Sequence, residues 1–125
     1  MKTHLMIATF GALGVLSRYG IDRITSYLTI TTLPISTFII NILGSFALGL
    51  IYVLGNEKGL LDSTTYLAIS IGFLGGFTTF SSFSIQTLML FEQRQFILAI
   101  GYFLLSPMLG LAATYAGVCI ARHII

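Results

Sequence analysis

The chain has 125 residues, of which 56% are hydrophobic and 8% are charged. An ordinary soluble domain carries charge on about a quarter of its residues, so six basic and four acidic residues cannot give this chain a water-compatible surface. The basic residues are scattered, which argues against the basic patch of a nucleic-acid binder. One cysteine, Cys119, cannot form an internal disulfide. The composition therefore predicts a membrane protein.

The charges divide the chain into long uncharged runs, which cover residues 3–17, 24–56, 63–91 and 95–121. A bilayer core of about 30 Å takes roughly 20 helical residues. Each of the last three runs can hold one span, and the first can do so only if its helix carries Arg18 in or near the membrane. The sequence predicts an all-α membrane protein with one domain, residues 1–125. Its four transmembrane helices are expected at about 4–27, 34–55, 64–91 and 96–121.

The predicted boundaries have local causes. Pro34 suits a helix start, where its missing N–H is not needed, and residues 55–59 and 92–95 form polar turns. A cleaved signal peptide is the alternative for the first segment, because Lys2 precedes an apolar stretch. No small-residue cleavage site leads into a soluble domain, so we expect this segment to remain as the first helix.

The basic residues are nearly balanced between the two ends of the predicted bundle. Four spans place both termini and the 56–62 loop on one side. The basic residues there are Lys2, Lys58 and Arg122, against Arg23, Arg94 and, if it snorkels that way, Arg18 on the other. Orientation in the membrane follows Lys/Arg asymmetry. A balanced chain can therefore insert in both orientations, unless so few charges are simply uninformative.

Polar groups within the first two helices are costly in a membrane and mark pathways or helix contacts. Gly11, Gly14, Arg18 and Asp22 share one face of the first helix. The alternative for the last two is an internal ion pair near the interface. In the second helix, Asn41 lies in mid-span, where its amide needs partners or a wet cavity and offers two donors suited to an anion.

Small residues follow Asn41 on the same face of the second helix. They are Gly44, Ser45 and Gly49. Glycine and serine at this spacing are typical of close helix packing in membranes. We therefore expect Gly44 and Gly49 to mark a helix contact.

The most specific segment of the chain is residues 72–84, GFLGGFTTFSSFS. Paired glycines followed by hydroxyl residues make a poor continuous helix, so the third helix should break near its middle. Interrupted spans are tolerated where freed backbone lines a cavity or binds an ion, with carbonyls offered to cations. Phe80 and Phe83 share a face, and the positive edge of an aromatic ring can favour an anion. Phe73 and Phe77 are expected to pack or to face lipid.

The fourth helix carries a row of small or hydroxyl-bearing residues. Tyr102, Ser106, Gly110 and Thr114 follow one another at spacings of four. Their hydroxyl protons can rotate toward an ion. The alternatives are that serine and threonine bond to carbonyls of their own helix, and that Tyr102 belongs to an interfacial aromatic belt.

Together these residues resemble the Fluc (CrcB-type) fluoride channel family of microorganisms. The resemblance covers all four spans and rests above all on GGFTTFSSFS at residues 75–84, with Arg18-Tyr19 and Asn41. It implies an antiparallel, dual-topology homodimer with two fluoride pores, one structural sodium ion at the dyad and no enzymatic activity. The helical spans predict a place in the cell inner membrane. Leu74 stands where the family often has cysteine, and Ser82 where it usually has threonine.

The resemblance also implies a role for individual residues. Gly75 and Thr78 would give backbone carbonyls to the sodium ion, and Arg18 would lie at the vestibule of the pore. Asn41 would line the fluoride pore, and Phe80 and Phe83 would form its aromatic box. The polar contacts of the fluoride pore would come from Ser81, Ser82, Tyr102, Ser106 and Thr114.

Two other functions remain as alternatives. A small multidrug-resistance-type, proton-coupled exporter is also small, four-helical and dual-topology. It is built around a glutamate in its first helix, whereas this chain has no carboxylate in mid-span, and Asp22 lies too close to a helix end. A membrane assembly subunit would need no ion pathway. A fluoride pore needs donors without a fixed charge that would trap the ion, which the amide, hydroxyls and ring edges supply.

Overall fold

The computed structural model describes residues 1–124, and these contain helices and no strand. The predicted four helices and the interruption of the third are confirmed, while Ile125, the end of the predicted domain, lies outside the described residues. The first helix is α1 (Lys2–Leu28), the second is α2 (Ile35–Tyr52) with the π-helical turn η1 (Val53–Glu57), and the fourth is α6 (Phe96–Ile124). The third consists of α3 (Ser63–Leu67), the π-helical η2 (Ala68–Leu74), α4 (Gly75–Phe77) and α5 (Phe80–Glu92).

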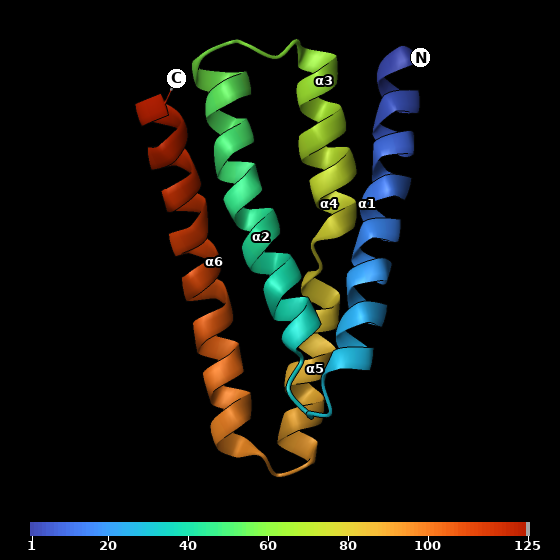
Figure 1. Cartoon of the computed structure of the whole chain (residues 1–125), viewed down its shortest axis with the longest axis vertical. Helices are drawn as coiled ribbons and strands as arrows, with labels where there is room; N and C mark the ends of the chain where they lie inside the picture. The colour runs from blue at the N-terminus through green and yellow to red at the C-terminus, as the bar shows by residue number, and fades with distance from the viewer. Residues whose placement is uncertain (125) are drawn as a thin grey trace.

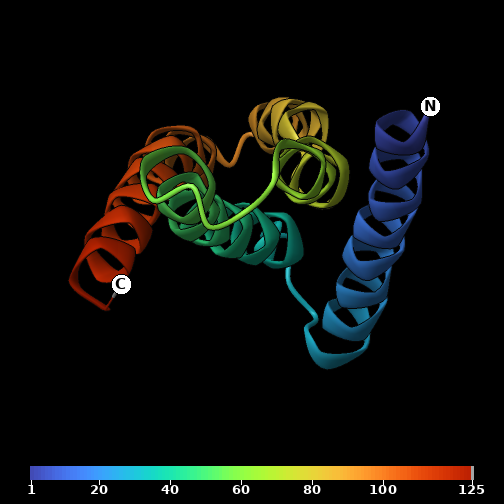
Figure 2. The ribbon, with the colours of Figure 1, turned by 90° about the horizontal axis from the view of Figure 1, so that it is seen from above.

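The helices run up and down, with short connections. Both termini and the α2–α3 connection lie at one end of the molecule, and the other two connections lie at the opposite end (Figure 1). Seen along the bundle, α1 and α6 stand on opposite sides, with α2 and the interrupted helix between them (Figure 2). α2 packs mainly on α6, and α1 packs mainly on η2 and α4. The two ends therefore carry the basic residues that the sequence assigned to them.

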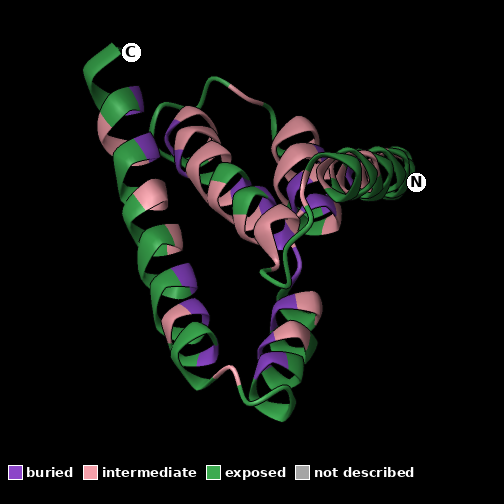
Figure 3. Ribbon diagram, turned by 60° about the horizontal axis from the view of Figure 1, so that its bottom comes forward, coloured by how far each residue is buried: buried purple, intermediate pink, exposed green. Residues whose placement is uncertain are grey.

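Three of the helical segments are long and apolar enough to cross a membrane. They are Ile35–Glu57, Ser63–Glu92 and Phe96–Ile124. Much of the outward face of α1 and α6 is exposed (Figure 3), and large apolar side chains cover it. α1 is not among these segments: it has 27 residues but carries Arg18, Asp22 and Arg23 in its second half. The three apolar helices make this a multi-pass membrane protein.

Glycines bring α1 against the third helix. A Cβ added to Gly14 would lie 2.1 Å from the carbonyl oxygen of Phe73, and one added to Gly76 would lie 2.6 Å from that of Gly11. Both separations are far below van der Waals contact. The backbones therefore touch directly, which is how small residues support helix association in membranes.

Glycines also bring the backbones of α2 and α6 into contact. A Cβ on Gly49 would lie 2.2 Å from the carbonyl oxygen of Thr114, and a Cβ on Gly117 would lie 2.3 Å from that of Phe46. Gly44 faces a threonine side chain of the third helix, 2.2 Å from where its Cβ would be. Close packing is thus confirmed for Gly44 and Gly49.

The third helix starts at a carboxylate cap outside the apolar spans. The side chain of Asp62 accepts hydrogen bonds from the hydroxyl of Thr65, 2.8 Å from Oδ1, and from its backbone N–H, 3.1 Å from Oδ2. A carboxylate at this position satisfies a backbone donor that the helix leaves free. These bonds, the hydroxyl first, hold the pKa of Asp62 below its ordinary value.

This lowered pKa predicts a pH-dependent stability. The folded state binds the Asp62 proton less readily than the unfolded state, so the cap contributes fully above the ordinary aspartate pKa of about 3.9 and is lost as the pH falls through the lower folded value. We expect Asp62→Ala to have a lower melting temperature than the wild type at pH 7. The difference between the two melting temperatures should narrow on acidification. Thermal unfolding in detergent measures it, with Ser63→Ala as the neighbouring control. A gap that stays constant in acid would contradict the prediction.

Candidate functional site

The interruption of the third helix faces an open cavity of about 500 Å³. α2, the third helix and α6 form its walls. Seven of the predicted ion-site residues lie together in this cavity: Asn41, Gly75, Thr78, Phe80, Phe83, Ser106 and Thr114. None of the side chains that line it carries a formal charge. The fold thus gathers neutral polar groups and two aromatic rings from three helices.

The helix breaks at two threonines rather than at the paired glycines. Thr78 and Thr79 both have extended backbone, with ψ of 159° and 116°, whereas Gly75 and Gly76 remain helical in α4. The hydroxyl of Thr79 accepts a hydrogen bond from the backbone N–H of Ser82 at 3.2 Å and so caps α5. The break therefore falls where a hydroxyl can start the next helix.

Asn41 fastens the broken backbone from the neighbouring helix. Its Nδ2 donates to the carbonyl oxygen of Thr79 at 3.1 Å, and its Oδ1 accepts from the N–H of Thr79 at 2.8 Å. The amide replaces partners that an intact helix would supply. Because one of its two N–H groups is used in this way, Asn41 has one donor left for an anion, and not the two that we expected.

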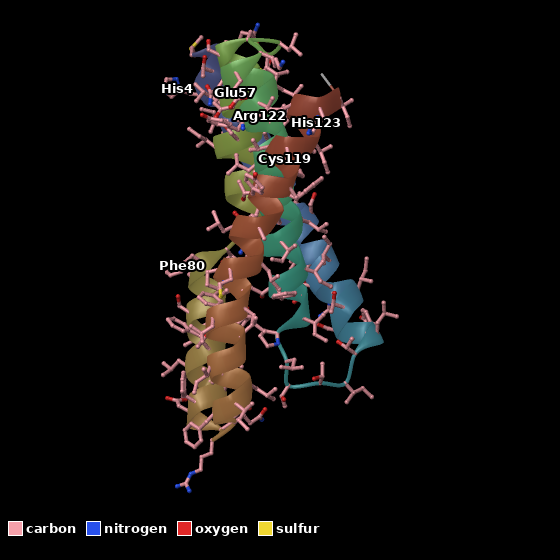
Figure 4. The ribbon with its side chains drawn as sticks, turned by 90° about the vertical axis from the view of Figure 1, so that its left-hand side faces the viewer. His4, Glu57, Phe80, Cys119, Arg122 and His123 are labelled. Carbon is pink, nitrogen blue, oxygen red and sulfur yellow. The ribbon has the colours of Figure 1, made fainter. Side chains whose placement is uncertain are left out.

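The aromatic residues separate into two groups. The rings of Phe80 and Phe83 lie 5.6 Å apart between centroids, but Phe80 is 77% exposed and Phe83 only 6%. Figure 4 shows Phe80 at the edge of the molecule, beside the break. The ring of Phe83 also lies 5.1 Å from that of Tyr102. Phe73 and Phe77 stack on each other at 5.8 Å, which confirms the packing expected for them.

The hydroxyl groups on α6 differ in what they contact. Ser106 is buried and lines the cavity. The Oγ1 of Thr114 lies 3.1 Å from two carbonyl oxygens, that of Gly110 in its own helix and that of Ser45 in α2. The Thr114 hydroxyl can therefore donate to the carbonyl of its own helix, as the alternative from the sequence expected, or to the carbonyl of Ser45 in α2.

Arg18 lines a second cavity, of about 240 Å³, between α1, α2 and the break. Among residues 1–124 the only ion pair is that between Glu57 and Arg122, which lie near each other at one end in Figure 4. The Arg18–Asp22 pair is therefore wrong. The carboxylate of Asp22 instead accepts a hydrogen bond from the hydroxyl of Ser36 and ties α1 to α2.

Two marked serines lie at the break but outside the main cavity. Ser82 lines the cavity of Arg18, and its hydroxyl accepts from that of Thr79 at 3.1 Å. Ser81 is exposed, with its Oγ 3.3 Å from the Thr79 hydroxyl. Thr79 borders both cavities. It is the residue through which they adjoin, and the sequence did not single it out.

Tyr102 belongs to a polar chain that the sequence analysis missed in part. Its hydroxyl donates to Oε1 of Gln86 at 3.1 Å, and Nε2 of Gln86 donates to the hydroxyl of Thr37 at 2.9 Å. This chain joins α6, α5 and α2. The available signal was the amide of Gln86 within an uncharged span, where polar groups are uncommon. Tyr102 is buried, so it is not an interfacial belt residue, and it borders an apolar groove.

The chemistry of the site is that of weak, neutral contacts. Within residues 1–124 no three His, Cys, Asp or Glu side chains gather around a point that could hold a metal ion. The oxygens near the break that could hold a cation are neutral: backbone carbonyls, hydroxyls and the amide oxygen of Asn41. Amide, hydroxyl and ring-edge groups around an uncharged cavity suit the passage of a small anion.

These features define a class: a small multi-pass membrane protein whose interrupted helix faces an uncharged polar cavity. Residues 5–118 match the family model described as CrcB-like protein, Camphor Resistance (CrcB), and the chain belongs to this family. A relative named Fluoride-specific ion channel FluC, from Geotalea uraniireducens, is 40% identical over 122 residues and 98% of both chains. A relative of the same name from Geobacter metallireducens is 39% identical over 124 residues, 99% of this chain and 100% of its own.

Proposed function

We propose that this protein is a fluoride-selective channel that lets fluoride leave the cytoplasm passively and so relieves its toxicity. The observation that carries the proposal is the uncharged cavity at the helix break, in a chain whose relatives bear the name of fluoride-specific channels. Fluoride is small and strongly hydrated. A selective pore must replace its water with donors and still release the ion, which a fixed positive charge would hinder.

The pore would follow the cavity wall. Asn41 offers its remaining N–H, and Phe80 and Phe83 offer ring edges, whose positive quadrupole favours an anion. Further contacts within the cavity would come from Ser106 and Thr114. Ser81, Ser82 and Tyr102 lie outside this cavity and would contact the ion beyond it. Arg18, in the adjoining cavity, would attract anions at the vestibule.

The working unit would be a homodimer. A polar cavity that opens toward lipid is unfavourable, because the hydrocarbon offers no hydrogen-bond partners. The exposed ring of Phe80 stands at this opening. A second copy that covers the cavity would remove both the polar surface and the exposed ring from lipid.

The two copies would be antiparallel, in the cell inner membrane. One end of the subunit carries three basic residues and the other carries Arg23 and Arg94, with Arg18 as a third if it snorkels that way. The chain therefore lacks the asymmetry that would fix its orientation. This arrangement requires α1 to cross the membrane as a fourth span, with Arg18 close to the end that holds the α1–α2 connection.

A sodium ion at the dyad fits the backbone at the break. The N–H of Thr79 would pair with the carbonyl of Gly75 in a continuous helix, but it donates to Asn41 instead. The N–H of Ser82 would pair with the carbonyl of Thr78, but it donates to the Thr79 hydroxyl. Carbonyl dipoles suit a hard cation, and two-fold symmetry would bring together two such carbonyls from each subunit.

Fluoride efflux from liposomes tests the function. We expect the purified protein to release fluoride but not chloride, and Phe80→Ile and Phe83→Ile to slow the release strongly. Each change removes a quadrupole contribution of about 1 kcal/mol from the ion at its site. Phe91→Ile, on the far turn of α5, serves as the control. Equal rates for fluoride and chloride, or proton-coupled uptake of organic cations, would contradict the proposal and favour the exporter.

A further inference from the structure

We infer that Thr79 is the residue that builds the cation site, although it donates no ligand to it. This inference rests on the sodium ion proposed above. It concerns how two backbone carbonyls of one membrane helix, those of Gly75 and Thr78, come to be available as ligands.

The first step is the backbone of Thr79. Its extended conformation, φ −152° and ψ 116°, ends the helical hydrogen bonding after α4. Its N–H points to Oδ1 of Asn41 at 2.8 Å, and its carbonyl accepts from Nδ2 at 3.1 Å. The N–H that would otherwise occupy the carbonyl of Gly75 is thereby removed from it.

The second step is the side chain of the same residue. The hydroxyl of Thr79 accepts from the N–H of Ser82 at 3.2 Å, and Ser82 is the residue four positions after Thr78. The ordinary helical partner of the Thr78 carbonyl is therefore also taken. A single residue diverts both donors, one through its own N–H and one through its Oγ1.

Thr78 makes a useful contrast, because its hydroxyl does something different. Its Oγ1 donates to the carbonyl of Leu74, one turn earlier in its own helix, at 2.9 Å. It diverts no N–H from either proposed ligand. The two adjacent threonines thus have the same side chain, and only that of Thr79 keeps a carbonyl available.

Valine at position 79 would remove this hydroxyl. Without the hydroxyl, the N–H of Ser82 loses its cap, and the acceptor that an unbroken helix would give it is the carbonyl of Thr78, four residues earlier. That carbonyl then becomes a poor ligand. Loss of groups that orient metal ligands typically weakens metal binding by roughly 10–100-fold.

The experiment measures sodium affinity through stability, without reference to flux. A ligand that binds only the folded state stabilises it by RT ln(1 + c/Kd) at ligand concentration c, so the melting temperature rises once this concentration exceeds the dissociation constant Kd. We expect the melting temperature of the purified wild-type protein to rise with sodium but not with choline at equal ionic strength. Thr79→Val should need roughly 10–100-fold more sodium for the same rise. Thr79→Ser, which keeps the hydroxyl, should titrate like the wild type, and so should Thr87→Val, which removes a threonine hydroxyl that donates to the carbonyl of Phe83 within α5.

The outcomes separate the two levels of the proposal. A wild-type protein that melts alike in sodium and choline would overturn the sodium site itself. If the melting temperature of the wild type depends on sodium, an unchanged sodium titration in Thr79→Val, or an equal loss of sodium affinity in Thr87→Val, would overturn the role of Thr79. If Thr79→Val does not elute as a monodisperse protein, Thr79→Ala carries the same test, because it also lacks the hydroxyl but leaves room at the site.

Discussion

Asn41→Asp is expected to abolish fluoride efflux in a protein that still folds. The amide of Asn41 now donates to the carbonyl oxygen of Thr79 and leaves one N–H facing the cavity. Aspartate has no N–H, so a carboxylate oxygen would lie against the Thr79 carbonyl and against any passing anion. Two like charges 4 Å apart repel by about 4 kcal/mol at an effective dielectric constant near 20. That corresponds to a loss of roughly a thousandfold in rate.

The same variant separates the pore from the backbone at the break. The Oδ1 acceptor for the N–H of Thr79 survives in aspartate, so we expect sodium-dependent melting to persist while flux disappears. Asn56→Asp is the matched control: it makes the same change at an exposed asparagine, whose amide donates to the hydroxyl of Tyr66. Efflux and melting are measured on the same preparations. If Asn41→Asp retained half of the wild-type flux, Asn41 would lie off the ion pathway.

The spans were predictable because charge is so costly in a membrane. The long uncharged runs could be read directly, and the structure has a helix in each. The interruption was predictable as well, since glycines and hydroxyls together weaken a helix. The position of the break could not be predicted. The chain breaks at Thr78 and Thr79 rather than at Gly75 and Gly76, and the side chain that bonds to the open backbone, Asn41, is 38 residues away in the sequence.

Interactions between side chains could not be predicted from their spacing within one helix. Arg18 and Asp22 are four residues apart and share a face, yet the carboxylate bonds to Ser36 on the next helix. Conversely, Thr37 and Gln86 showed no local pattern and form a buried chain with Tyr102 across three helices. Sequence spacing states which residues face the same way. It does not state which side chain of a neighbouring helix reaches them first.

The glycines of α2 were also predictable only in part. Gly44 and Gly49 could be assigned to helix packing from spacing alone, and the structure places other helices against both. Spacing does not say which glycine touches backbone and which faces open space. On α6, Gly117 and Gly101 look alike in sequence, but only the first lies against another helix.

We therefore expect glycine-to-alanine substitution to lower the melting temperature at Gly117 and not at Gly101 of the same helix. In Gly117→Ala the new Cβ would lie 2.3 Å from the carbonyl oxygen of Phe46 and 3.1 Å from the N–H nitrogen of Leu50. Both are backbone atoms of α2 and cannot turn aside. Overpacking of this kind costs about 1–3 kcal/mol or more, so we expect a lower melting temperature.

The loss should extend to flux. To admit the methyl group, α6 must move away from α2, and Thr114, three residues earlier, would then lose the carbonyl of Ser45 that lies 3.1 Å from its Oγ1. Both residues line the cavity, so its wall would open. Gly101→Ala meets nothing within 4 Å, and alanine is favoured over glycine in a helix by up to about 1 kcal/mol. That variant should melt at or above the wild type and conduct normally. Equal melting temperatures and equal efflux for the two alanine variants would show that α2 and α6 are not held at backbone contact, because the same added methyl group would then have the same consequence against a helix and in open space.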